Sequence, residues 1–265
     1  MQLINPAELT ERPQWYVLRF PNTGLVAGQT NINVELRTDS DAPFRMTAMA
    51  VYAFNADNEA LGAAGNVGLT MRVARADNSW MQKRLTFAQQ LNPFDTNAVN
   101  GAAAQPAAFF SYFSPLGKNE FYPAGSSILV DLVQQPAVTD ALVMVVFLGT
   151  KLFRAGAVWA PTYPPRYRGR PFNGYNLQAA LPSTNNPMNV DPDADFVWRG
   201  GAQSPGTPRA FGVKFKDWSG KYYMNDFVPA DLIFGYDNSQ TPGLIYPEIY
   251  IPKQQALYFD LAVLP

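Results

Sequence analysis

Proline and glycine are spread along the whole chain, and their spacing rarely leaves room for a long helix. The 265 residues include 23 prolines and 19 glycines. A proline inside a helix removes a backbone hydrogen bond and clashes with the preceding turn. Between the prolines and glycines lie short runs rich in Val, Ile, Phe, Tyr and Leu, which is the pattern of many short strands joined by turns. The sequence therefore predicts an all-β protein of the sandwich or barrel type.

Several segments of the first half have the composition of strands, and some alternate between apolar and polar residues. In residues 32–37, Ile32, Val34 and Leu36 would share one face of a strand, with polar residues on the other face. The further candidates are residues 15–20, 44–54, 69–75, 80–87, 128–133 and 142–148. Counted generously, the first half holds about eight strands, the number that a jelly roll contains.

The second half echoes the first in three places that follow the same order. Residues 40–45 resemble residues 193–198, residues 69–87 resemble residues 211–227, and residues 122–132 resemble residues 251–261. The shared pattern is an acidic turn, a hairpin and a proline-led final strand, with few identical residues. We therefore predict two jelly-roll or β-sandwich-like domains that are related by a weak internal repeat.

The two predicted domains differ at their ends. The first continues beyond its last repeat segment into a long apolar strand at residues 141–153, and the second shows no such strand after residues 251–261. A missing strand leaves an open edge, which can pair with another segment. We expect this edge to be covered by the connector between the domains, by the N-terminal arm or by another subunit.

The predicted organisation is an N-terminal arm at residues 1–13, a first domain at 14–155, an extended connector at 156–190 and a shorter second domain at 191–265. The connector is rich in Pro, Tyr and Arg, and its many prolines disfavour a regular sheet there. It either wraps the domain surface as an ordinary linker or packs on a neighbouring subunit, because Tyr and Arg are favoured in interfaces. The candidate interface residues are Trp159, Tyr163, Arg166, Tyr167, Arg168, Arg170 and Tyr175.

The charge of the chain is low and balanced. Charged residues make up 15% of the chain, aromatic residues 14%, and the formal net charge is −1. Soluble domains usually carry about 25% charged residues. Either copies of the chain cover much of its surface, or the surface is polar through Asn, Gln, Ser and Thr. Proteins that bind nucleic acid concentrate basic charge on one face, so we expect no nucleic-acid partner.

The chain has no cysteine and no histidine, which excludes disulfides, thiol chemistry, Cys or His zinc sites and histidine-containing triads. Histidine is also the usual acid–base residue near neutral pH. We therefore expect no enzymatic activity and no cofactor.

A membrane-spanning helix needs about 20 apolar residues, which no run provides. A signal peptide would be apolar near the start of the chain, where this sequence has Glu8, Glu11 and Arg12. We therefore expect folding in the cytoplasm.

Two further groups of residues have alternative interpretations. Asp191, Asp193 and Asp195 could hold calcium through their carboxylates, but the spacing lacks the glycine and the glutamate of an EF-hand loop. They could instead form a solvated turn that enters a strand at Phe196. Exposed tryptophans could stack on sugar rings, or they could fill a barrel or an interface. The tryptophans concerned are Trp80, Trp198 and Trp218.

The combined pattern resembles jelly-roll structural proteins of bacteriophage virions. The residues that carry the resemblance are Phe20-Pro21 with Gly24, the acidic turn at 39–44, residues 122–128 leading into Val130-Asp131-Leu132, and Gly149 to Phe153. The resemblance is good over residues 15–153 and loose over 190–265. It carries over no functional residue, because such proteins act through surfaces.

The resemblance implies a non-enzymatic structural protein that is assembled in the host cytoplasm and resides in the virion. Its partners would be copies of itself, as a trimer or higher oligomer, and other virion proteins. The first expected position is a minor capsid or decoration role on the head, the second is the neck or tail, and the third is a two-barrel major capsid protein. The alternative function is a carbohydrate-binding β-sandwich for attachment to cell surfaces.

Overall fold

The computed structural model describes residues 9–20, 30–54, 69–77, 79, 81, 86–87, 114–134, 142–154, 174–202, 211–234 and 243–264. Strands make up most of the described chain, and a short helix of five residues accompanies them. All pairings between the described strands are antiparallel. The all-β prediction is therefore confirmed.

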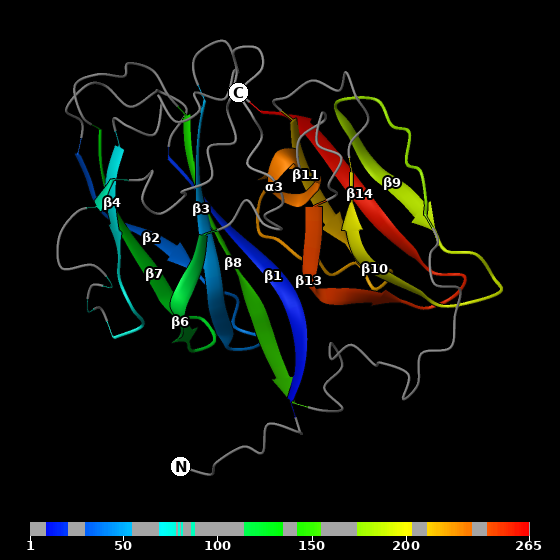
Figure 1. Cartoon of the computed structure of the whole chain (residues 1–265), viewed down its shortest axis with the longest axis horizontal. Helices are drawn as coiled ribbons and strands as arrows, with labels where there is room; N and C mark the ends of the chain where they lie inside the picture. Colours follow the sequence, from blue (N-terminus) through cyan, green and yellow to red (C-terminus); the bar gives the residue numbers. More distant parts are fainter. Residues whose placement is uncertain are drawn as a thin grey trace.

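The first half consists of two four-stranded sheets (Figure 1), in the orders β1-β8-β3-β6 and β2-β7-β4-β5. Successive strands along the sequence mostly belong to different sheets. This alternation gives the Greek-key order of an eight-stranded jelly roll. The strands are β1 (Leu9–Arg19), β2 (Thr30–Arg37), β3 (Phe44–Phe54), β4 (Leu69–Val73), β5 (Thr86–Phe87), β6 (Ser114–Tyr122), β7 (Ser127–Gln134) and β8 (Leu142–Arg154).

The second half contains one four-stranded sheet, in the order β12-β11-β14-β9, and one two-stranded sheet of β10 and β13. A short helix, α3, follows β12 and contacts β10, β11 and β13. The elements are β9 (Ser183–Asn189), β10 (Phe196–Gly201), β11 (Phe211–Lys216), β12 (Val228–Pro229), α3 (Ala230–Phe234), β13 (Gly243–Ile251) and β14 (Ala256–Val263).

The strand pairings of the second half reproduce those of six strands in the first. The order β9-β14-β11-β12 corresponds to β2-β7-β4-β5, and the pair β10-β13 corresponds to β3-β6. The register agrees residue by residue: Val73 pairs with Val130 as Phe215 pairs with Phe259. The irregularity after Met46 in β3 also recurs after Trp198 in β10. The described part of the second half has no counterpart of β1 or β8.

A left-handed asparagine occurs at the same place in both halves. Asn33 has a φ of 53° and Asn185 a φ of 54°. Each donates its backbone N–H to a buried aspartate: Asn33 to Asp131 Oδ1 at 2.8 Å, and Asn185 to Asp260 Oδ1 at 2.7 Å. Asparagine tolerates this backbone conformation better than most residues. The local structure is therefore retained although few residues are identical.

The structure places the predicted repeat segments in slightly different registers. Tyr122 pairs with Phe44 as Ile251 pairs with Phe196, so Phe44 and Phe196 hold equivalent positions, one position away from the sequence match. In the hairpin, the backbone bond from Arg75 to Ser79 corresponds to the bond from Asp217 to Lys221, two positions away from the match. The sequence match followed the acidic turn residues, whereas the pairing of the strands determines the actual correspondence.

Two strands extend into segments for which no sheet was expected. β1 begins at Leu9, which pairs with Arg154, so residues 9–13 of the predicted arm belong to the first sheet. β9 lies inside the predicted connector, where we expected no regular sheet, and this expectation is wrong for Ser183–Asn189. Its Pro187 is accommodated because β9 is an edge strand. β9 also covers one side of β14, so the final strand has neighbours on both sides.

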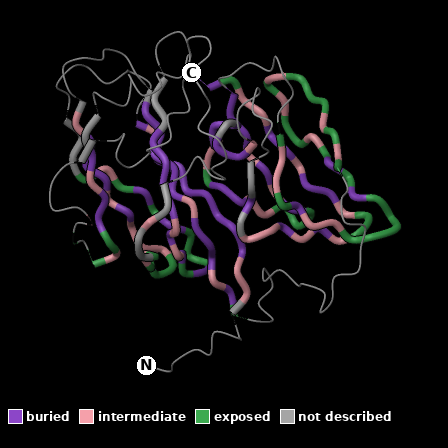
Figure 2. Tube along the Cα trace, in the orientation of Figure 1, coloured by how far each residue is buried: buried purple, intermediate pink, exposed green. Residues whose placement is uncertain are grey.

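The two halves share a hydrophobic core (Figure 2). Val143, Val145 and Phe147 of β8 pack between the two sheets of the first half, whereas Met144 and Val146 pack with the second half. All five side chains are fully buried. A strand that is buried on both faces has a nearly continuous apolar sequence, which explains the long apolar run of β8.

Candidate functional site

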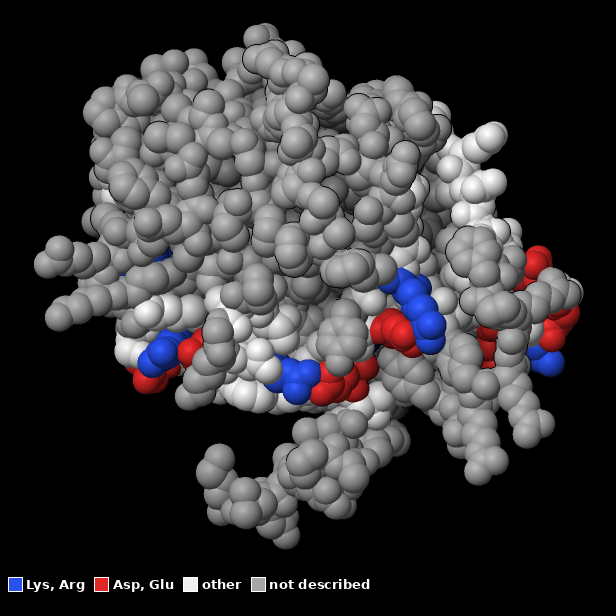
Figure 3. All heavy atoms as spheres, viewed as in Figure 1, with Lys and Arg blue, Asp and Glu red and all other residues white. Residues whose placement is uncertain are grey.

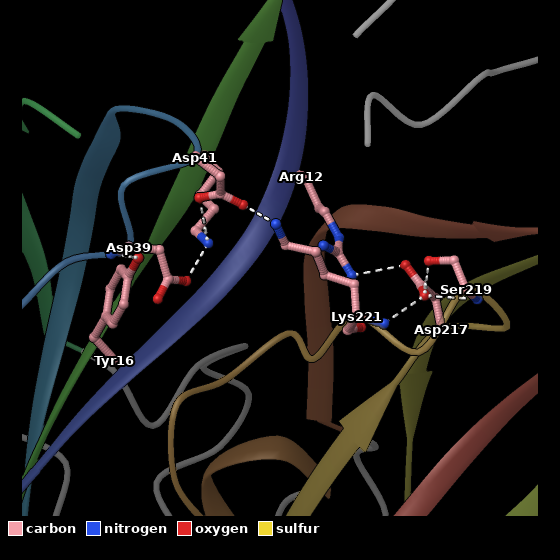
Figure 4. Close-up of polar contacts among 8 residues, drawn as sticks. Arg12, Tyr16, Asp39, Asp41, Asp217, Ser219 and Lys221 are labelled. Carbon is pink, nitrogen blue, oxygen red and sulfur yellow. Dashed lines mark hydrogen bonds and ion pairs between the residues drawn. The ribbon is translucent and has the colours of Figure 1, made fainter. Parts of the chain in front are cut away.

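A group of charged residues joins the two halves and is the most distinctive polar feature of the described chain (Figure 4). It brings together the start of β1, the loop before β3, the end of β8 and the hairpin after β11. Charged side chains are rarely fully buried unless they are paired. Lys151 is fully buried here and Arg12 is 3% exposed. The anionic partners of these two cations therefore define the site.

Lys151 binds two aspartates of the loop before β3. Its Nζ contacts Asp39 Oδ2 and lies 3.0 Å from Asp41 Oδ1. Asp41 Oδ2 in turn binds Lys221 of the second half. The carboxylate of Asp41 therefore bridges one lysine from each half.

Arg12 makes a second link between the halves. Its Nη2 donates to Asp217 Oδ2 at 2.8 Å and to the carbonyl oxygen of Lys221 at 2.9 Å. The guanidinium also lies 4.0 Å from the ring centroid of Tyr223, which is a cation–π contact. One side chain of β1 thus binds a carboxylate, a carbonyl and an aromatic ring of the second half.

Asp217 is positioned by the turn that it stabilises. Its Oδ1 accepts hydrogen bonds from Ser219 N, Ser219 Oγ and Lys221 N. An aspartate that binds the backbone two residues on is a common turn stabiliser. Because Oδ1 holds the turn, Oδ2 is directed at Arg12, and the hairpin is fixed against β1.

The environment shifts the ionisation of two groups in this site. Burial alone would raise the pKa of Asp41, but the hydrogen bonds from Lys221 and Lys151 outweigh it and lower the pKa below its usual value. Burial raises the pKa of Tyr16, whose hydroxyl accepts the backbone N–H of Asp39 at 2.9 Å. At neutral pH Asp41 is therefore ionised and Tyr16 neutral, which matches the charges that the contacts require.

The arrangement links two parts of the chain through paired charges. The carboxylates of Asp39, Asp41 and Asp217 are all engaged by cations or by N–H and O–H donors of the same chain. Within the residues that the structure describes, no group of three or more possible metal ligands occurs. The site therefore holds two parts of the protein together.

The backbone of β1 adds direct hydrogen bonds to this junction. Trp15 N donates to the carbonyl of Tyr223 at 2.9 Å. Asn225 accepts from Val17 N through Oδ1 at 2.7 Å and donates to the Val17 carbonyl through Nδ2 at 3.0 Å. A segment of the second half thus covers the outer edge of the first sheet, which would otherwise be exposed.

The aspartates considered as a calcium site are engaged by hydrogen-bond donors. Asp195 accepts from Lys253 N at 2.9 Å and from the Tyr250 hydroxyl at 2.7 Å, and these two bonds lower the pKa of Asp195. Asp191 accepts from the Tyr175 hydroxyl at 3.2 Å. All three aspartates are exposed. They form a turn that leads into β10 at Phe196, in agreement with the solvated-turn interpretation.

Of the candidate interface residues, the structure describes Tyr175. Its ring is half-buried and packs edge-on against Phe196, with ring centroids 4.9 Å apart. Its contacts are therefore made within the chain. The other candidates lie outside the described residues: Trp159, Tyr163, Arg166, Tyr167, Arg168 and Arg170.

The tryptophans differ in exposure. Trp198 is 5% exposed and packs against Phe215, Phe234 and Phe259, so it belongs to the shared core. Trp218 is 39% exposed, on the turn that Asp217 holds. Trp80 lies outside the described residues.

The sequence carries a signal for one member of the junction, Lys151. Lys151 is a cation near the end of the long apolar run of β8, and a cation in a buried strand requires an anionic partner. Arg12 and Asp217 gave no comparable signal, because they are 205 residues apart. Their proximity depends on how the two halves pack.

The charged groups on the surface alternate in sign. In Figure 3, the described basic and acidic residues of the visible face lie beside one another in pairs. Among the described residues, Arg199 and Glu248 form an exposed ion pair, with Nε 2.8 Å from Oε1.

Comparison with known proteins gave no assignment. No protein-family model matches the chain, and no curated protein matches its sequence. In the described part of the chain, no helix is both long and apolar enough to cross a membrane. The jelly-roll first half, the shared core and the charged junction are thus the observations on which a function can be proposed.

Proposed function

We propose that this protein is a structural component of a bacteriophage virion and that it assembles as a homo-oligomer. The observation that carries the proposal is the eight-stranded jelly roll, six strands of which recur in the second half with the same pairing. Jelly rolls occur in viral capsid and lectin domains. The resemblance in residues 15–153 to jelly-roll virion proteins agrees with this choice.

Within this class, the fixed joining of two halves supports a two-barrel capsid subunit, beside the minor capsid, decoration and neck roles. A subunit that contributes two barrels to a shell must hold them in one relative orientation. The two-sided burial of β8 and the link from Arg12 to Asp217 both fix this orientation.

The partners in this proposal are copies of the chain and other virion proteins, in a particle assembled in the host cytoplasm. The described charged residues of the visible face carry both signs, which suits contacts between protein surfaces, since opposite charges can meet across them. The proposed role is non-enzymatic, uses no cofactor and involves no nucleic acid.

The oligomeric state tests the proposal most directly. Sedimentation velocity and native mass spectrometry of the purified chain should give a trimer or a higher oligomer, with residues 159–175 protected from protease. Electron microscopy of intact particles with the chain labelled should place it on the shell. A chain that stays monomeric at high concentration, or that is absent from particles, would contradict the proposal.

One observation supports a second function, a carbohydrate-binding β-sandwich. Trp218 is the exposed tryptophan of the described chain and is held on a rigid turn, where its ring could stack on a sugar. Glycan titration should then shift the tryptophan fluorescence of the wild type, and Trp218→Ala should abolish the shift. A structural role predicts no shift with any glycan.

A further inference from the structure

Lys151 of β8 is a buried lysine that lies against a carboxylate. Its side chain is 0% exposed, and its Nζ contacts Asp39 Oδ2. Lysine amines serve as nucleophiles in proteins, and an amine that attacks a carboxyl carbon forms an amide. The chain has no cysteine for disulfides. An amide between these two side chains would therefore be a covalent link of another kind.

The backbone of Lys151 is held on both sides. Within the first sheet, Lys151 pairs with Arg12 of β1 and with Phe44 of β3. A buried strand that is paired along both edges cannot move without losing backbone hydrogen bonds. The direction in which the Lys151 side chain leaves β8 is therefore fixed.

The backbone of Asp39 is held as firmly, although it belongs to a loop. Its N–H donates to the Tyr16 hydroxyl at 2.9 Å, and Figure 4 shows the Tyr16 ring beside Asp39. Its carbonyl oxygen accepts the N–H of Gly125, also at 2.9 Å. Two reacting groups that are held in contact react as if one were present at a very high concentration. The fold therefore supplies the proximity that amide formation requires.

Asp41 is placed to transfer protons. Its Oδ1 lies 3.0 Å from Lys151 Nζ, within the distance over which a general base accepts a proton. Burial alone would raise the pKa of Asp41, but the hydrogen bonds from Lys221 and Lys151 hold this pKa below its usual value. Asp41 is therefore ionised at neutral pH and can accept a proton from the amine that it contacts.

We propose that Lys151 and Asp39 form an amide bond within the chain, with Asp41 as the residue that transfers the protons. Asp41 takes one proton from the Lys151 ammonium and passes it to the Asp39 carboxylate, which becomes a carboxylic acid. The Nζ lone pair then forms a bond to Asp39 Cγ, and the electron pair of one C–O bond leaves with the oxygen. A second proton from Nζ reaches that oxygen through Asp41, so one water is released and Asp41 ends ionised.

The charges around the site favour the amide. Before the reaction, Lys151 and Lys221 face Asp39 and Asp41, which makes two cations and two anions. The amide removes one charge of each sign, and Asp41 stays paired with Lys221. A buried ion pair carries a desolvation cost that a neutral group avoids. The buried position of Nζ is therefore better suited to an amide than to an ammonium.

The released water has a route out of the protein. The Asp39 side chain is 49% exposed, whereas the Lys151 side chain is buried. The oxygen that leaves Asp39 thus reaches solvent, and the amide nitrogen stays in the interior. The link would join positions 112 apart in the sequence and fasten the end of β8 to the loop before β3. It goes beyond the proposed function and does not depend on it.

Mass spectrometry of the purified full chain tests the inference. The denatured chain should be lighter than its sequence mass by one water. After digestion with trypsin, residues 38–45 and 119–154 should appear as one branched peptide, because trypsin cleaves after Lys and Arg but not after an acylated lysine. Fragmentation of this peptide should place the link between Lys151 and Asp39.

Three variants assign the roles. Lys151→Arg keeps a cation but replaces the amine, so its mass should equal its sequence mass. In Asp41→Asn, followed by mass spectrometry after cell-free synthesis, the link should form at least about a hundredfold more slowly than in the wild type, because the general base is lost. Lys214→Arg is the matched control, because Lys214 Nζ donates to the carbonyl of Asn225, and this variant should lose one water as the wild type does.

Each other outcome has a definite meaning. A wild-type chain at its full sequence mass would overturn the inference, whether or not the variants fold. A water loss that maps to another acceptor, such as Asp41, would overturn the assignment of Asp39. Formation at the wild-type rate in Asp41→Asn would contradict the role of Asp41. None of these results bears on the proposed function, which is tested by the oligomeric state and by the presence of the chain in particles.

Discussion

Arg12 and Asp217 are 205 residues apart in the sequence and form a buried ion pair, with Nη2 2.8 Å from Oδ2. Side-chain exposure is 3% for Arg12 and 11% for Asp217. A pair of this kind contributes to specificity because neither charge can be left buried without the other. It therefore links the orientation of the halves to the stability of the whole chain.

Removing one partner of this pair should be strongly destabilising. Arg12→Ala leaves the Asp217 carboxylate partly unpaired and removes the contact with Tyr223, which should lower the free energy of unfolding by about 3–5 kcal/mol. Urea denaturation at pH 7 measures this change. The control is Arg199→Ala, since Arg199 and Glu248 are 67% and 40% exposed and their pair should contribute less than about 1 kcal/mol. Similar losses in both variants would contradict a special role for Arg12.

Acid should weaken the junction through Asp41. The pKa of Asp41 is lower in the folded chain than in the unfolded chain, so its ionised form stabilises the fold at neutral pH. This stabilisation is complete above the unfolded pKa of about 3.9 and is lost as the pH falls through the lower folded pKa. Urea denaturation between pH 7 and pH 2.5 should show a smaller acid-induced loss in Asp41→Asn than in the wild type. Parallel curves would rule out a contribution from Asp41.

Gly149 should not tolerate a side chain. In Gly149→Ala, the added Cβ would meet the Arg45 carbonyl and the Phe44 ring, so β8 would have to move away from β3. Such overpacking costs about 1–3 kcal/mol or more. Gly220→Ala is the control, because a Cβ there meets nothing within 4 Å and the cost is limited to its φ of +84°. Thermal unfolding should place Gly149→Ala well below Gly220→Ala.

The two halves should unfold together. Met144 and Val146 of the first half pack in one cluster with Phe211, Val213 and other residues of the second, so the second half cannot lose its core without disturbing β8, which also packs in the core of the first half. Calorimetry should show a single transition whose calorimetric and van't Hoff enthalpies agree. Two separate transitions would mean that the shared core contributes little.

Much of the fold could be predicted from local patterns. The alternation of Val34 and Leu36 identified β2, and the apolar run ending near Phe153 identified β8. The predicted repeat rested in part on the proline-led turns before β7 and β14, which have the same length. Its register in the hairpin was off by two positions, because turn composition does not fix strand pairing.

The junction could not be predicted in the same way. Local patterns identify strands, but they do not say which strand face packs on another half of the chain. Met144 and Val145 look alike in the sequence, yet they lie in different cores. The partners of Lys151 and Arg12 follow from that packing, so they became visible only in three dimensions. No strand was expected at β9 because Pro187 disfavours a regular sheet. The expectation was wrong because an edge strand accepts proline.

The two-sided burial of β8 also has a mechanical consequence. Consecutive residues of this strand are fully buried and press on opposite cores, so β8 cannot shift toward one core without opening a gap in the other. A force on either half should therefore be transmitted through β8 to the other half. In the proposed particle, an external load would be shared by both halves of each subunit.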